Sequence, residues 1–191
     1  MSRRSIEQFS PARLEAFLPS REFAFPRTLV EIVPQEIERK FLVAGDGWKS
    51  SVVRTARIRD GLVAILNGRK ARVRIIGDRA TIALKGQHNG LGRSEFEYPI
   101  PASDAEEILR TMCDDRVLGK VRNYVPHAGL TWEIDVYEGI LKGVVIAEVE
   151  LDRADRALQL PDWVGKEITG DVRYSKFNME KAARRRARSR Q

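Results

Sequence analysis

The stretch 36–43, with the sequence EIERKFLV, decides how the rest of the chain is interpreted. Side chains of an extended chain alternate between two faces, so Glu36, Glu38 and Lys40 share one face of this stretch. The opposite face is mostly apolar. Alternation with a period of two residues predicts a β-strand. The polar face carries charges of both signs, so the interpretation depends on whether this face lies in water or inside the protein.

Eight further runs with the same alternation follow along the chain. They are 54–59, 62–66, 70–76, 80–85, 93–99, 117–125, 131–137 and 144–151. Turn residues such as Gly77-Asp78 separate them, so neighbouring strands are expected to pair antiparallel through hairpins. Between two runs, Ser103-Asp104-Ala105-Glu106 predicts a capping box that starts one helix. A second helix is expected from about Ser175 into the basic C-terminal end.

The charged residues of these strands fall two apart and share a face. The basic ones are Lys40, Arg72, Arg74, Lys85, Lys120 and Arg122, and the acidic ones are Glu36, Glu38, Glu95, Glu97, Glu133, Asp135, Glu148 and Glu150. An open antiparallel sheet with one face in water is the commoner arrangement. A solvated face, however, normally mixes Ser, Thr, Gln and Lys, and so many strands must also protect their edges. We therefore expect an α+β protein with a closed antiparallel β-barrel and helices packed outside.

A lumen with both signs of charge needs a ligand that satisfies both. Arginine and lysine side chains form charge-assisted hydrogen bonds with phosphate oxygens. Carboxylates would repel the same phosphate unless they bind Mg²⁺ or Mn²⁺, hard cations that bridge carboxylates to phosphates. The expected metal ligands are Glu36, Glu38, Asp135, Glu148 and Glu150. The remaining tunnel carboxylates, Glu95, Glu97 and Glu133, are given no definite role.

The segment Glu36-Ile37-Glu38-Arg39-Lys40 is a signature by which the sequence resembles the CYTH superfamily. This family includes adenylyl cyclases and thiamine triphosphatases and is also called the triphosphate tunnel metalloenzymes; the resemblance is strongest to its bacterial inorganic triphosphatases. The supporting motifs are Arg72-Val73-Arg74, the strand ending in Lys85, Arg93-Ser94-Glu95-Phe96-Glu97-Tyr98, the pair Lys120 and Arg122, Trp132-Glu133-Ile134-Asp135, Ala147-Glu148-Val149-Glu150 and Gly170-Asp171-Val172-Arg173-Tyr174. The match covers about residues 35–180.

The resemblance implies an eight-stranded tunnel. It also implies that glutamates of the first and last strands bind a divalent metal, and that basic residues bind a triphosphate. Lys40 and Glu38 are the expected catalytic residues, and Lys40 also belongs to the expected substrate-binding set. Similar triphosphatases often carry a tyrosine in the second strand, where this chain reads Arg59-Asp60-Gly61-Leu62. Leu62 cannot move a proton, so a metal-bound water is the expected nucleophile.

Three functions remain open at this stage. The first is metal-dependent hydrolysis of a triphosphate, with inorganic tripolyphosphate favoured. The second is formation of cyclic AMP from ATP in the same lumen, as in class IV-type adenylate cyclases. The third is a non-catalytic sensor that binds polyphosphate or nucleotide. Only the products formed distinguish the first two.

The net charge of +7 is concentrated at one end of the chain. Six of these charges lie in the segment 181–191, which we expect to be a basic disordered tail. Such a run contacts nucleic acid nonspecifically at most, so specific nucleic-acid binding is not expected. Residues 1–34 are expected to form an N-terminal extension to the domain 35–180, because Pro11, Pro19, Pro26 and Pro34 interrupt regular structure there.

Cys113 is the only cysteine, which excludes an internal disulfide and a multi-thiolate zinc site. It is expected to be a small buried apolar side chain. No apolar run approaches the ~20 residues of a membrane span, and the N-terminus lacks a secretory pattern. A cytoplasmic protein without membrane contact is therefore expected, with the oligomeric state, including a homodimer, left open.

Overall fold

The computed structural model of the protein describes residues 35–90, 92–113 and 116–189. The N-terminal extension expected at 1–34 lies outside these residues. The strands are β1 (Gln35–Val43), β2 (Arg54–Leu66), β3 (Arg69–Ile76), β4 (Arg79–Lys85), β5 (Gly92–Ile100), β6 (Val117–His127), β7 (Leu130–Tyr137), β8 (Val145–Glu150) and β9 (Val164–Glu167). The helices are α1 (Ala102–Thr111), α2 (Lys176–Arg188) and the 3₁₀ turns η3 (Gly47–Ser51), η4 (Gly139–Leu141) and η5 (Val172–Tyr174).

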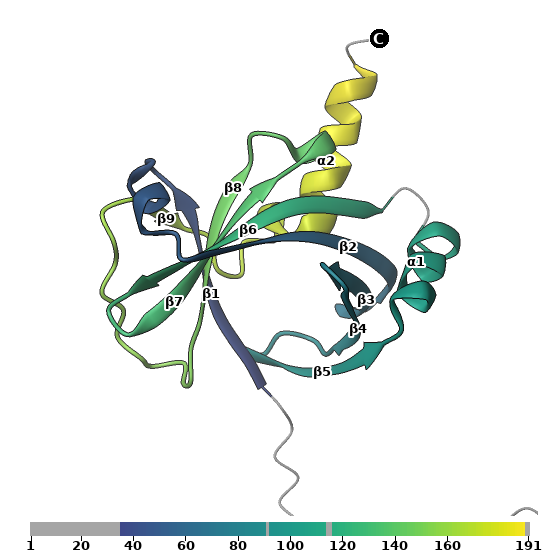
Figure 1. The fold of residues 1–191 in the computed structure, drawn as a ribbon, viewed down its shortest axis with the longest axis horizontal. Coiled ribbons are helices and arrows are strands. Elements are labelled where there is room, and N and C mark those ends of the chain that lie inside the picture. Colours follow the sequence, from purple (N-terminus) through teal and green to yellow (C-terminus); the bar gives the residue numbers. More distant parts are fainter. Residues whose placement is uncertain (1–34, 91, 114–115, 190–191) are drawn as a thin grey trace, which may run out of the picture. The chain divides into compact units, whose positions relative to one another are not determined.

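The first eight strands close into a barrel (Figure 1). Their order is β5-β4-β3-β2-β6-β7-β8-β1, and β1 closes the ring by pairing with both β8 and β5. The pairs are antiparallel, with Glu38 opposite Glu150 on one side of β1 and Glu36 opposite Arg93 on the other. Short β9 adds to β1 near Val43. The closed eight-stranded antiparallel barrel predicted from the alternation is thus confirmed.

Apolar residues on the outward faces of the strands are covered by two separate groups of side chains. Phe41 and Trp132 belong to the larger group, where their rings lie 5.5 Å apart and Trp163 packs edge-on against Trp132. Val73 of β3 packs with Leu109 of α1 in the other group. Burying these outward faces leaves the charged faces inside the barrel.

A third apolar group lies on the inward faces and closes part of the lumen. Leu118, Tyr137 and Ile146 are buried together, and Tyr174 and Met179 from the C-terminal segment pack against them. Each of the first three lies two residues from a charged lumen residue on its own strand, and therefore on the same face. Helix α2 consequently packs against inward-facing residues of the barrel and not only against its outside.

Two local predictions were wrong, and one short strand was missed. Residues 54–66 form the single strand β2 and not two strands, with a register shift between Leu62 and Ala64. Helix α1 begins at Ala102 after Pro101 and has no side-chain cap, so the predicted capping box is not formed. Strand β9 was not anticipated, because four residues are too few to show alternation.

The expected disordered tail is helical over most of its length. Helix α2 runs from Lys176 to Arg188, so residues 181–188 are part of an ordered element. Ser175 caps the helix by accepting a hydrogen bond from the Asn178 amide at 3.3 Å. Met179 and Ala183, four residues apart, pack together against the barrel. None of the helices in the described residues is both long and apolar enough to cross a bilayer.

Gly61 marks a place where α1 and the residues after it approach β2 closely. A Cβ atom there would lie 2.3 Å from Leu109 Cδ2 and 2.6 Å from Cys113 Sγ, and both side chains are buried. We predict that Gly61→Ala lowers the free energy of unfolding by about 1–3 kcal/mol, measured by urea denaturation. The control is Gly45→Ala, where an added Cβ meets nothing within 4 Å. Equal stability of the two variants would contradict this packing.

Candidate active site in the barrel lumen

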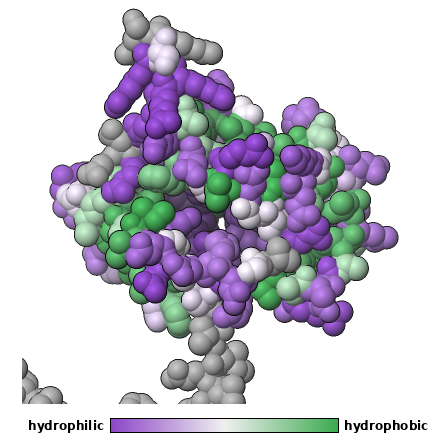
Figure 2. All heavy atoms as spheres, turned by 180° about the vertical axis from the view of Figure 1, so that it is seen from behind, coloured by the Kyte–Doolittle hydropathy of each residue, from purple (hydrophilic) through white to green (hydrophobic). Residues whose placement is uncertain are grey.

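The lumen is lined by a network of ion pairs between residues of different strands. Seen from behind, the barrel is hollowed near its centre, and hydrophilic residues surround the opening (Figure 2). The predicted residues that join this network are Glu36, Glu38, Lys40, Arg72, Arg74, Lys85, Glu95, Lys120, Arg122, Glu133, Asp135 and Glu148. The structure therefore brings almost the whole predicted set together.

One part of the network connects β1, β4 and β5. The Lys85 ammonium donates to Glu36 at 2.6 Å and to Glu95 at 2.7 Å. Arg93, which was not among the predicted site residues, donates to the other Glu36 oxygen at 2.6 Å. Burial opposes ionisation of Glu36, but Lys85 and Arg93 outweigh it and lower the pKa of this carboxyl below its ordinary value. Glu36 is therefore an ionised carboxylate with both oxygens occupied.

A second part connects β1, β6, β7 and β8. Arg122 donates to Asp135 at 2.7 Å and to Glu148 at 2.9 Å, and it also binds Glu133. The Lys40 ammonium bridges Glu148 at 2.7 Å and Glu38 at 2.9 Å. Burial opposes ionisation of Lys40, but Glu148 and Glu38 outweigh this and raise its pKa above the ordinary value. Lys40 therefore remains a cation and is unsuited to act as a base.

A third part is centred on Asp60, which sequence reasoning missed. Its carboxylate accepts from Arg74 Nε at 2.7 Å and from Lys176 Nζ at 2.6 Å, so the first residue of α2 reaches an inward-facing carboxylate of β2. Burial would raise the pKa of Asp60, but Lys176 and Arg74 hold it well below the usual value. Period-two alternation from Ile58 could have placed Asp60 inside. The predicted runs 54–59 and 62–66 leave Asp60 unassigned between them.

Two carboxylate pairs of like charge lie directly opposite each other on neighbouring strands. Glu38 faces Glu150 across β1 and β8, and Glu133 faces Glu148 across β7 and β8. Directly opposed like charges destabilise a sheet unless a cation intervenes. Burial, followed by the charges of Glu133, Glu36 and Glu38, raises the pKa of Glu150. The carboxylate oxygens in this region have the chemistry that Mg²⁺ and Mn²⁺ prefer.

As the side chains stand, the described residues contain no group of three or more His, Cys, Asp or Glu arranged to hold a metal ion. The predicted metal ligands Glu36, Asp135 and Glu148 bind lysine or arginine instead. Binding a metal would therefore require carboxylates to exchange a cationic side chain for the ion. Carboxylate oxygens are suitable ligands for a hard divalent cation, but in this structure these carboxylates form ion pairs with lysine and arginine.

Three predicted positions differ from the rest. Glu150 is exposed and, within the described residues, forms no ion pair. Glu97 is at the margin of the network, because its side chain is half exposed and its one ion pair within the described residues is with Arg72, at 3.3 Å. Leu62 lies opposite Arg72 in the β2–β3 register. An apolar side chain therefore stands where similar triphosphatases often carry a tyrosine. Tyr137 does not replace it as a base, because burial and the charges of Glu148 and Asp135 raise its pKa well above the ordinary value.

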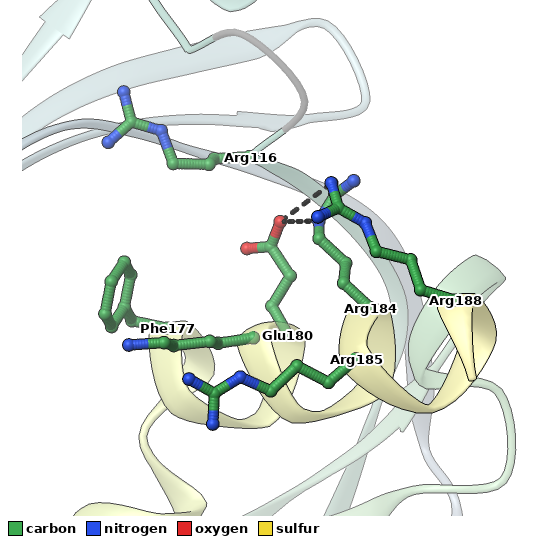
Figure 3. Close-up of a pocket in the computed structure, with 7 residues that line it drawn as sticks. Arg116, Phe177, Glu180, Arg184, Arg185 and Arg188 are labelled. Atoms are coloured by element: carbon green, nitrogen blue, oxygen red, sulfur yellow. Dashed lines mark hydrogen bonds and ion pairs between the residues drawn. The ribbon is translucent and has the colours of Figure 1, made fainter.

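Outside the lumen, α2 borders a pocket of about 330 Å³ (Figure 3). Its lining residues are Arg116, Phe177, Glu180, Lys181, Arg184, Arg185 and Arg188. The buried Glu180 carboxylate accepts from Arg184 Nε at 2.9 Å. Much of the positive charge that we expected in a disordered tail thus lies on an ordered helix, in a pocket that shares no residue with the ion-pair network.

The chain belongs to the CYTH domain family, whose domain matches residues 34–185. It is 40% identical over 147 residues to an inorganic triphosphatase of Acetivibrio thermocellus, covering 77% of this chain and 94% of that protein. It is 32% identical over 151 residues to an inorganic triphosphatase of Nitrosomonas europaea, covering 73% and 92%. A crystal structure of an inorganic triphosphatase superposes with a TM-score of 0.54 at 29% identity, covering 76% of this chain and 93% of the other. The predicted family is confirmed.

The Asp60 cluster yields a stability prediction. Asp60→Ala leaves Arg74 and Lys176 without their shared carboxylate inside the barrel, and an uncompensated buried charge is costly. We expect the free energy of unfolding to fall by about 3–5 kcal/mol in urea denaturation. Asp155→Ala is the matched control, because Asp155 is exposed, and its effect should stay within about 0.5 kcal/mol. A similarly small effect for Asp60→Ala would show that the cluster does not hold α2 to the barrel.

Proposed function

We propose that this protein hydrolyses a phosphoanhydride bond of a triphosphate in its barrel lumen, that it does so with Mg²⁺ or Mn²⁺, and that inorganic tripolyphosphate is the favoured substrate. The observation that carries the proposal is a lumen in which inward-facing cations alternate with carboxylates, some of them opposed in like-charged pairs. The two relatives named inorganic triphosphatase support the choice of substrate.

The basic residues would hold the phosphate chain. Arg72 and Arg74 lie two residues apart on one face of β3, and Arg122 lies on β6, so the cations approach the lumen from different strands. Arginine offers a planar fork of donors that matches phosphate oxygens. Lys85 and Lys120 would add point charges from β4 and β6. Because each of these cations now binds a carboxylate, phosphate oxygens would take the place of carboxylate oxygens.

The carboxylates released by this exchange would hold the divalent metal together with Glu150, which has no ion pair in the described residues. The principal ligands would be Glu36, Glu38 and Glu150. Asp135 pairs with Arg122, and Glu148 pairs with Arg122 and Lys40. These two carboxylates would also become available to a metal if phosphate bound their cations. A bound Mg²⁺ or Mn²⁺ supplies charge neutralisation of the phosphate oxygens and lowers the pKa of coordinated water. The opposition of Glu38 and Glu150 across β1 and β8 is the feature that favours this placement.

Lys40 would act by charge and position. It is a cation held between Glu38 and Glu148, where it can bind the oxygens of the phosphoryl group that is transferred. Phosphoryl transfer requires little covalent chemistry from the protein, so positioning and electrostatic stabilisation provide most of the acceleration. Glu38 would keep Lys40 oriented in addition to its role toward the metal.

The decisive experiment measures products from tripolyphosphate and ATP in parallel, with Mg²⁺, with Mn²⁺ and with EDTA. We predict phosphate and diphosphate from tripolyphosphate, complete inhibition by EDTA, and slower release from ATP. Cyclic AMP with diphosphate from ATP would identify a cyclase instead. Binding of tripolyphosphate without any product would indicate a sensor, and either result would overturn the proposed function.

The Lys40→Ala variant tests the assignment within the site. Loss of a charge that stabilises the transferring group should reduce kcat/KM for tripolyphosphate by about 10²–10³-fold. The circular dichroism spectrum should stay that of the wild-type barrel. Lys49→Ala is the matched control, because Lys49 lies in η3 and, among the described residues, its one ion pair is with Asp46 at 2.8 Å. Full activity of Lys40→Ala would remove Lys40 from the catalytic set.

A further inference from the structure

Lys70 faces the lumen, although the charge pattern of the strands did not single it out. It lies two residues before Arg72 on β3, and residues two apart share a face. Its partner in the β3–β4 register is Lys85, whose ammonium is in the lumen network. Lys70, Arg72 and Arg74 thus form a row of three cations, about 6.6 Å apart along one strand.

The side chain of Lys70 differs from the other lumen cations by its lack of a partner. Lys40, Lys85 and Lys120 each bind at least one carboxylate. In the described part of the chain, Lys70 forms no ion pair and no hydrogen bond through its ammonium group. A phosphate could bind to Lys70 without displacing a carboxylate, whereas every other lysine in the lumen must first exchange one.

The surroundings of Lys70 are strongly cationic. Burial lowers its pKa, and the charges of Arg93, Lys40 and Lys85 lower it further, while Glu38 opposes them. These cations come from β5, β1 and β4, so they surround one side of the lumen. Most of their charge is taken up by Glu36, Glu38 and Glu95. The charge of Lys70 is what remains uncompensated in this part of the lumen.

We propose that Lys70 is a further substrate-binding residue, which together with Lys40, Lys85 and Arg93 forms a subsite for one phosphate group of the tripolyphosphate chain. The inference rests on the proposed function for the identity of the ligand. Among the described residues, no ion pair or ammonium hydrogen bond accounts for the place of Lys70 inside the barrel. An uncompensated charge held close to three other cations costs stability, which is a common property of residues kept for binding.

The test uses tripolyphosphate as the probe and measures both binding and stability. Dissociation constants are determined by titration calorimetry in EDTA, and kinetics are measured with Mg²⁺. For Lys70→Met, which keeps the aliphatic stem, we predict at least tenfold weaker binding, equivalent to about 1.4 kcal/mol. The value of KM should rise by a similar factor while kcat changes less than threefold. The melting temperature without ligand should be equal to or higher than that of the wild type.

Two variants serve as controls. Lys70→Arg keeps the charge and should bind within threefold of the wild type. Lys142→Ala removes an exposed lysine and should change neither binding nor melting temperature. A Lys70→Met protein with unchanged affinity, or with a lower melting temperature and unchanged affinity, would overturn the proposal. If the wild type binds tripolyphosphate but releases no product, the proposed function fails while the binding comparison still tests Lys70. A wild type that does not bind tripolyphosphate would overturn both.

Discussion

In a closed barrel most inward-facing charges must be compensated by other side chains inside the lumen, and the rest of the structure depends on this constraint. The antiparallel register fixes which residues face inward and places Glu38 opposite Glu150 and Glu133 opposite Glu148. These side chains belong to a ring without free edges. Their repulsion must therefore be offset by cations, as Arg122 of β6 does by pairing with both Glu133 and Glu148.

This compensation explains why the lumen is an organised set of ion pairs. Buried ion pairs seldom stabilise a fold more than apolar residues of similar size would, because removing both charges from water is costly. A network that extends over most strands therefore indicates a role beyond stability. Under the proposed function, each pair would separate as its cation binds phosphate and its carboxylate binds a metal. Helix α2 contributes to the same arrangement, because Lys176 compensates Asp60 while Met179 packs on inward-facing apolar residues.

Much of the barrel and the lumen could be predicted from the sequence, because period-two alternation determines both the strands and the face of each charge. The alternation was not followed through Asp60, which lies between the predicted runs 54–59 and 62–66, although the adjacent Gly61 continues the strand and makes room for α1. Lys176 could not be predicted, because its partner Asp60 is 116 residues away and the contact depends on how a helix docks. The run 181–188 was misread for a related reason, since composition indicated disorder while packing by Ala183 and Met179 keeps the helix ordered.

The central claim is that the lumen exchanges its ion pairs for a phosphate chain and a metal. A crystal structure of the protein with tripolyphosphate and Mn²⁺, with the ion located by its anomalous signal, tests this most directly. Our account predicts phosphate groups between Arg72, Arg74 and Arg122, Mn²⁺ on Glu38 and Glu150, and a broken contact between Arg122 and Glu148. Phosphate and metal bound only on the outside of the barrel, with the lumen ion pairs intact, would contradict it.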